Sequence, residues 1–162
     1  MRKKISPQII NMLVIVGIAL TLLVLLATPL VLTAFLKSAF SILDQGLVTA
    51  ITSCIYLCAV PYLIALFQLK KICSIIVRNN PFTFDAAKAL KIISICAFSE
   101  IVLFIGCSIY LVYAHDMFLY AMTIIPMIIV TFISLAIGFL SLTLSQLFEQ
   151  ATRMKEENDQ TI

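Results

Sequence analysis

Residues 5–36 read ISPQIINMLVIVGIALTLLVLLATPLVLTAFL, and none of them carries a charge. A helix of about 20 apolar residues is long enough to cross the roughly 30 Å hydrocarbon core of a bilayer. Residues 45–69 and 117–148 are also free of charge, and residues 92–115 contain one acid, Glu100. The sequence therefore predicts four membrane-spanning helices, at about residues 9–31, 47–69, 92–113 and 118–147.

The composition of the whole chain supports this interpretation. Of the 162 residues, 62% are hydrophobic and 12% are charged, whereas roughly 25% of the residues in soluble domains are charged. A soluble domain of this length could not bury so much apolar surface, so a soluble enzyme and a disordered chain are excluded. Lipid offers no partners to backbone amides outside helices. We therefore predict an all-α integral membrane four-helix bundle, with residues 1–162 forming one domain.

The N-terminus has two interpretations. Arg2, Lys3 and Lys4 precede an apolar run, as they would in a secretory signal peptide. That run is longer than the 7–15 residues typical of a signal peptide, and no clear small-residue cleavage site follows it. We expect the segment to be retained as the first span.

The positive charges predict the orientation of the spans. Lys37 lies between the first and second spans, and the other Lys and Arg residues lie on the opposite side of the membrane: Arg2, Lys3, Lys4, Lys70, Lys71, Arg78, Lys88, Lys91, Arg153 and Lys155. Lys and Arg are enriched in cytoplasmic segments. Both termini and the 70–91 connection are therefore predicted to be cytoplasmic, and the 32–46 loop and the Tyr113–Phe118 turn to lie outside. Because topology accounts for the net charge of +3, we expect contact with lipid headgroups and no direct binding of nucleic acid.

The residues that could carry catalysis or bind a metal are few. Cys54 and Cys58 share a helix face at a spacing that could hold a metal, but His115 is the only histidine and it lies in the outer turn. Structural zinc usually needs four Cys or His ligands. We expect the cysteines to act as small packing residues, and we predict no catalytic residues, no metal, no cofactor and no enzyme activity.

Glu100 is the unusual residue of the third span. It lies about nine residues into the span, roughly 12 Å deep at 1.5 Å per residue. An acid at this depth is expected to face the bundle interior or water. Counting inward from the cytoplasmic ends places Tyr62 and Ser141 at a similar depth, where their hydroxyls could donate to the carboxyl group. This predicted buried polar site is either a structural link between helices or a site that responds to protons or a ligand.

The fourth span carries a stripe of small residues. Its members recur at alternating spacings of three and four residues: Thr131, Ser134, Gly138, Ser141 and Ser145. Small residues let another helix approach closely. The stripe predicts a packing seam, and the alternative is the lining of a pore.

Two cytoplasmic segments could bind a partner. Asn79-Asn80-Pro81 is expected to end the second helix, and Thr83 is a candidate N-cap of the third, with Asp85 in its first turn. The polar tail, residues 149–162, carries an acidic cluster, and its first half is expected to continue the fourth helix. The candidate partner-binding residues are Pro81, Phe82, Thr83, Glu156, Glu157 and Asp159.

These two segments also carry a resemblance to a known family. The turn reads Asn80-Pro81-Phe82-Thr83, followed by Asp85, Leu90, Lys91 and Ile92, and the chain closes on KEENDQTI at residues 155–162. The chain resembles domain-of-unknown-function family 2975, which comprises small bacterial four-span membrane proteins. Its members typically show a Pro-Phe-Thr turn before the third span and a tail like LKEENDLTI; this chain has Met154, Gln160 and Asp85 where the family usually has Leu, Leu and Glu.

The resemblance implies a location but no particular activity. It places the chain in the bacterial cytoplasmic membrane as a multi-pass protein. Members of the family are often encoded beside a small helix-turn-helix regulator, which implies a membrane protein paired with a cytosolic DNA-binding protein.

Three functions remain open from the sequence. The first is a non-enzymatic membrane regulator that tethers a small helix-turn-helix transcription regulator through the acidic tail. The second is a proton- or ion-coupled transporter or channel subunit that uses Glu100; this function implies a homo-oligomer, because four spans enclose a pathway only thinly. The third is an immunity protein against a membrane-active peptide, which only size and charge support.

Overall fold

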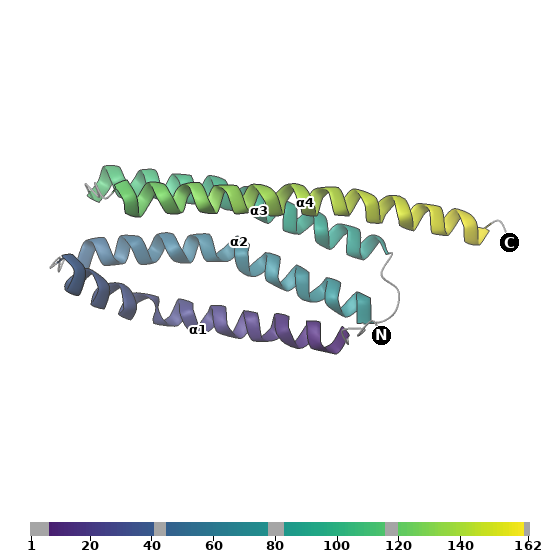
Figure 1. Cartoon of the computed structure of the whole chain (residues 1–162), viewed down its shortest axis with the longest axis horizontal. Helices are drawn as coiled ribbons and strands as arrows, with labels where there is room; N and C mark the ends of the chain where they lie inside the picture. Colours follow the sequence, from purple (N-terminus) through teal and green to yellow (C-terminus); the bar gives the residue numbers. More distant parts are fainter. Residues whose placement is uncertain (1–6, 41–44, 78–82, 116–119, 161–162) are drawn as a thin grey trace.

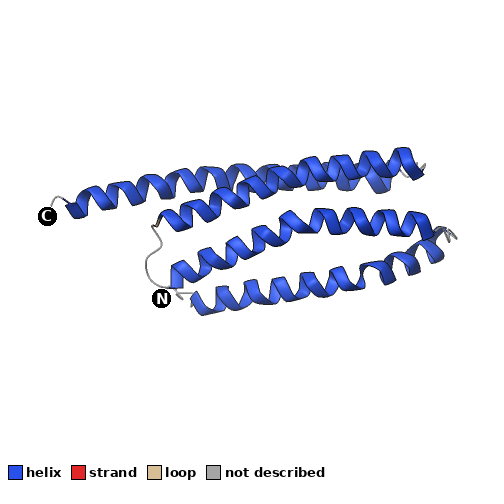
Figure 2. Cartoon of the chain, turned by 180° about the vertical axis from the view of Figure 1, so that it is seen from behind, coloured by secondary structure: helices blue, strands red, loops and turns tan. Residues whose placement is uncertain are grey.

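The computed structural model describes residues 7–40, 45–77, 83–115 and 120–160. These residues form four helices, α1 (Pro7–Phe40), α2 (Gln45–Val77), α3 (Phe84–His115) and α4 (Tyr120–Gln160), and no strand among them. The helices run back and forth along one axis, and both chain ends lie at the same end of the molecule (Figure 1). The described part of the chain is helical throughout when seen from behind as well (Figure 2), which confirms the predicted all-α class.

Each helix is long and apolar enough to cross a membrane. The candidate spans are Asn11–Ser38, Gln45–Ile76, Phe84–Ala114 and Ile124–Asn158. Apolar side chains are exposed along all of them, as expected where lipid replaces water as the solvent. The protein is therefore a multi-pass membrane protein with four candidate spans in its described residues.

The helices extend beyond the segments that the absence of charge predicted. Most of the expected outer loop at residues 32–46 is helical, because α1 continues to Phe40 with Lys37 in its last turn. The expected tail is also helical as far as Gln160. A helix is not required to end at the membrane surface, because the hydrogen bonds within it remain satisfied when it enters water. The expected outer turn at Tyr113–Phe118 is helical to His115, and residues 116–119 lie outside the described residues.

Within the described residues, each helix contacts only its neighbours in the sequence. α1 packs on α2, α2 on α3, and α3 on α4. No packing connects α1 with α3 or α4, or α2 with α4, in this part of the chain. Among the described residues, α2 and α4 are therefore connected only through α3.

The predicted stripe of small residues lies in the seam between α3 and α4. Ser134, Gly138, Ser141 and Ser145 are all buried. The Ser145 hydroxyl donates a 2.7 Å hydrogen bond to the backbone oxygen of Ala87 in α3. A Cβ atom on Gly138 would lie 3.0 Å from Cζ of Phe98, so the glycine makes room for this ring. The structure confirms the packing seam.

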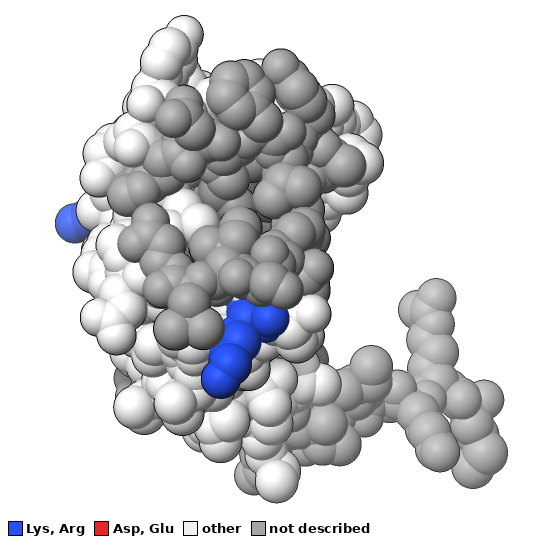
Figure 3. Space-filling model, turned by 90° about the vertical axis from the view of Figure 1, so that its left-hand side faces the viewer, with Lys and Arg blue, Asp and Glu red and all other residues white. Residues whose placement is uncertain are grey.

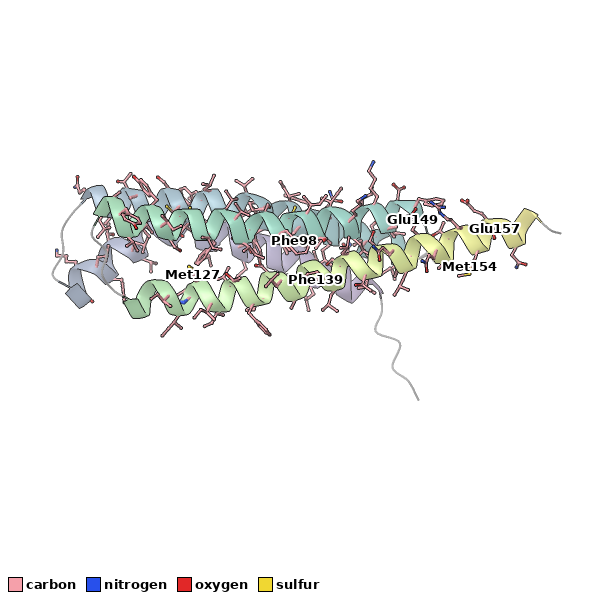
Figure 4. All side chains as sticks on the ribbon, turned by 90° about the horizontal axis from the view of Figure 1, so that it is seen from above. Phe98, Met127, Phe139, Glu149, Met154 and Glu157 are labelled. Carbon is pink, nitrogen blue, oxygen red and sulfur yellow. The ribbon has the colours of Figure 1, made fainter. Side chains whose placement is uncertain are left out.

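Aromatic contact continues the seam. The rings of Phe98 and Phe139 meet edge to face, with centroids 5.4 Å apart and planes at 83°, and Figure 4 shows them on adjacent helices. Such pairs stabilise by about 0.5–1.5 kcal/mol beyond the area that they bury. The middle of α3 is thus held against α4 by one glycine and one aromatic pair.

The seam between α2 and α3 is closed by small and branched residues near the 78–83 connection. Ile72 packs with Ala89 and Ile93 in a buried cluster. α1 is attached to α2 in part by the Tyr56 hydroxyl, which donates to the backbone oxygen of Leu25 at 3.1 Å. α2 therefore lies between α1 and α3.

The start of α3 confirms the predicted helix cap. The backbone amide of Ala86 donates to Thr83 Oγ1 at 3.3 Å, which satisfies one of the amides left free at a helix N-terminus. Asp85 lies in the first turn and forms an exposed 3.4 Å ion pair with Lys71 of α2. Exposed pairs of this kind contribute less than about 1 kcal/mol, so the cap and the buried cluster position this end of α3.

The opposite end of the molecule is poor in charge. Seen end-on, its described surface shows little blue and no red in Figure 3. Lys and Arg are concentrated instead at the end that contains both termini. The positive-inside rule therefore still predicts that the termini are cytoplasmic.

Candidate functional site

Glu100 lies in a groove between three helices. The groove has a volume of about 400 Å³, and α2, α3 and α4 all contribute to its walls. Its polar lining comes from the three residues of the predicted buried polar site, Glu100, Tyr62 and Ser141, together with Ser134; the rest is largely aliphatic. The structure thus brings the three predicted residues to one groove.

The predicted hydrogen bonds within this site are not formed. Oε2 of Glu100 is buried and has no hydrogen-bond partner among the described residues. Tyr62 and Ser141 nevertheless line the same groove as Glu100, as the counting of depth predicted. Cys58, one helical turn before Tyr62, was not predicted as a neighbour, and it lines a second cavity together with Glu100.

Glu100 also lines a second cavity. It has a volume of about 380 Å³ and is lined by Glu100, Phe104 and Cys107 of α3, residues of α2 that include Cys58, and α4. Glu100 is therefore common to the linings of both hollows.

The cysteines beside Glu100 come from two helices. Cys54 and Cys58 of α2 and Cys107 of α3 all line the second cavity, and all five cysteines of the chain are free thiols. The described residues include no group of three or more His, Cys, Asp or Glu side chains arranged to hold a metal. The thiols act as close packing between α2 and α3, which is the role that the sequence predicted.

A further hollow was not predicted from the sequence. It measures about 920 Å³ and lies between α2 and α3 toward the end opposite the termini. Its polar lining comprises Gln45, Thr49, Ser53 and Tyr110. The Thr49 and Ser53 hydroxyls donate to backbone oxygens of their own helix, at 2.8 Å each. Both hydroxyls are therefore satisfied within α2. No charged residue is among those that line the hollow.

The candidate partner-binding residues are brought together in part. A hollow of about 390 Å³ is lined by Phe84 at the start of α3 and by Arg153, Glu156 and Glu157 near the end of α4. Thr83 caps the same end of α3. Pro81 and Phe82 lie outside the described residues, as does the side chain of Asp159. Phe84, the residue next to the predicted turn, is the aromatic group that meets the predicted acidic cluster.

Charge and apolar surface alternate at this end of α4. Arg153 pairs with Glu149 at 2.8 Å, one turn away, while Glu156 and Glu157 are exposed one turn further on. Met154 is 64% exposed and Phe84 is 44% exposed. Figure 4 shows Met154 and Glu157 on the part of α4 that projects beyond the other helices, and Glu149 beside the end of α3. The projecting end offers acidic and apolar groups side by side.

The arrangement defines a class of protein: an all-helical, multi-pass membrane protein with an acid-containing groove within its spans and a projecting helix end. The chain belongs to the family described as Protein of unknown function (DUF2975), whose model matches residues 42–162. It is similar to the Uncharacterized membrane protein YoaS of Bacillus subtilis (strain 168), with 29% identity over 109 residues, 67% of this chain and 68% of that protein. No solved structure matches the chain.

The extent of the family match agrees with the packing. It comprises α2, α3 and α4 and begins just after α1. These three helices form the groove, the second cavity and the projecting end. Both candidate sites therefore lie in the part of the chain that the family shares.

Proposed function

We propose that the protein is a non-enzymatic membrane regulator that tethers a small, soluble helix-turn-helix transcription regulator at its cytoplasmic end. One observation carries this proposal: the start of α3 and the end of α4, selected separately in the sequence, line one hollow through Phe84, Arg153, Glu156 and Glu157. The partner's class comes from the family resemblance, and the hollow is the docking site that we assign to it.

The chemistry of the hollow suits such a partner. DNA-binding domains carry clustered Lys and Arg on one face, and acidic side chains opposite them speed encounter and fix the register of docking. The exposed surfaces of Phe84 and Met154 provide apolar contact next to these acids. A partner held in this way covers its own basic surface, which makes it unavailable to DNA while it is at the membrane.

Reversing the two acids tests the docking site. In cells that express the chain with a fluorescent helix-turn-helix regulator encoded beside it, Glu156→Lys combined with Glu157→Lys is expected to reduce the membrane-bound fraction of the regulator about tenfold or more, since like charges then face each other. Phe84→Ala is expected to weaken retention by a smaller factor. Fluorescence microscopy and membrane fractionation measure both effects.

Gln150→Lys is the control, because it adds a positive charge to the same helix at an exposed residue that does not line the hollow. Retention should be unchanged in this variant. A regulator that stays at the membrane equally well with the double reversal, or that is never retained by the unmodified chain, would disprove the proposal.

A further inference from the structure

Glu100 is a buried acid for which the described chain supplies no cation. The Lys and Arg residues of the described helices lie near the helix ends, and none of them lines either hollow beside Glu100. Its Oε2 atom is buried and has no hydrogen-bond partner in the described part of the chain. A buried acceptor without a donor is costly, so the site is incomplete as the chain forms it.

The groove that Glu100 lines has the size of a small-molecule site. Ligand pockets generally measure about 300–1,000 Å³ and combine apolar walls with a few polar groups. The groove of about 400 Å³ fits this description, with walls of residues such as Leu66, Ile93 and Ile137. α2 and α4, which form two of its walls, have no close backbone approach to each other in the described residues. The groove also lies within the candidate membrane spans, where a molecule dissolved in the bilayer can approach it without leaving the lipid.

We propose that Glu100 binds the ammonium group of a lipophilic amine whose apolar body lies in this groove. An ammonium group supplies the positive charge that no lining residue of the groove offers to the carboxylate, together with hydrogen-bond donors. Such charge-assisted hydrogen bonds are stronger than neutral ones, and a low-dielectric surrounding strengthens them further. The aliphatic walls recognise the rest of the ligand.

The same observations exclude an inorganic cation as the ligand. Divalent magnesium and calcium need six or more oxygen ligands, most of them carboxylates, carbonyls or water. The groove offers one carboxylate and a few hydroxyls, and no group of metal-binding side chains occurs in the described residues. The inference does not depend on the docking site at the end of α4, because the two sites share no lining residue.

A tryptophan placed beside the acid reports binding directly. The chain contains no tryptophan, so Phe104→Trp, in the cavity that adjoins Glu100, gives a single fluorophore. The protein is placed in nanodiscs of phosphatidylcholine, which carries no net charge. The probe is a decylamine that bears a nitroxide beside its ammonium group. The nitroxide quenches tryptophan at short range, and residue 104 lies one helical turn from Glu100. The comparison is the uncharged acetamide of the same molecule.

The amine is expected to quench Phe104→Trp with saturation, and the acetamide to quench it only weakly. Adding Glu100→Gln should raise the dissociation constant of the amine about tenfold or more, because the charge-assisted bond is lost. Ala97→Phe, which fills the groove and leaves the acid in place, should reduce binding as strongly. If Glu100→Gln does not fold, as judged by circular dichroism, Ala97→Phe decides alone.

A tryptophan on the lipid-facing surface provides the control for partitioning. Leu13 of α1 is highly exposed and lines none of these hollows, so Leu13→Trp should be quenched equally by the amine and the acetamide, without saturation. The proposal is overturned if Phe104→Trp is quenched equally by both probes, if its quenching does not saturate, or if neither Glu100→Gln nor Ala97→Phe weakens it.

Discussion

Replacing Gly138 with leucine is expected to separate α3 from α4 and to lower the free energy of unfolding by about 3 kcal/mol. Even a single Cβ atom at this position would lie 3.0 and 3.1 Å from two atoms of the Phe98 ring. The ring cannot move freely, because its other contact is the edge-to-face pair with Phe139. Overpacking of a tight contact typically costs about 1–3 kcal/mol, and leucine adds three further carbons beyond the one that already collides.

The measurement is a titration with sodium dodecyl sulfate in mixed micelles, monitored by circular dichroism. Gly106→Leu is the matched control, because a Cβ atom on Gly106 meets nothing within 4 Å. It makes the same chemical change in an adjacent helix and should leave the transition nearly unchanged. Equal effects of the two substitutions would show that helix propensity, and not the contact with Phe98, decides the outcome.

Replacing Ala89 with leucine is expected to have the next largest effect, a loss of about 2–3 kcal/mol. Ala89 is 1% exposed and packs with Ile72 and Ile93 in the cluster that joins α2 to α3. Larger side chains at such positions force neighbouring helices apart, because closely packed interiors have no space to take up the added volume. The detergent titration should therefore show an earlier transition.

Ala136→Leu provides the control for Ala89→Leu. Ala136 is exposed on α4, where a leucine would face lipid. Its transition should stay within about 0.5 kcal/mol of that of the unmodified protein. If Ala89→Leu is equally harmless, α2 and α3 do not pack through this cluster in the membrane.

The general architecture could be predicted from the sequence because the membrane imposes strong constraints. The first, second and fourth predicted spans lie in charge-free stretches and the third contains a single acid, Glu100, and residues 5–36 alone are enough to require a span. The packing role of Gly138 and Ser145 was also predictable, since small residues on one helix face allow close approach in lipid. The cap at Thr83 followed from its position before an apolar helix, after a proline.

The pairing of helices and the neighbours of Glu100 could not be predicted in the same way. Hydropathy gives the depth of a residue only to about one turn, and residues one turn apart on α2, Tyr62 and Cys58, each line a hollow together with Glu100. The separation of α2 from α4, which opens the groove, depends on the summed packing of whole helices. No local sequence pattern predicts how whole helices pack against one another.

The hollow between the start of α3 and the end of α4 could also be predicted only in part. The acidic cluster and the turn were each recognisable from residue type, but only the continuation of α4 as a helix to Gln160 places Glu156 and Glu157 beside Phe84. Charged residues form a helix as readily as they form a solvated tail, since Lys and Glu have high helix propensity. The joint site therefore required the structure.

Reporter fusions test the central claim, that the chain crosses the membrane four times with both ends and the 78–83 connection in the cytoplasm. Alkaline phosphatase, active only outside, and green fluorescent protein, fluorescent only inside, are fused after Ile162 and inserted separately at residues 41–44 and 78–82. We predict fluorescence without phosphatase activity after Ile162 and at 78–82, and the reverse at 41–44. Phosphatase activity after Ile162, or fluorescence at 41–44, would contradict the account.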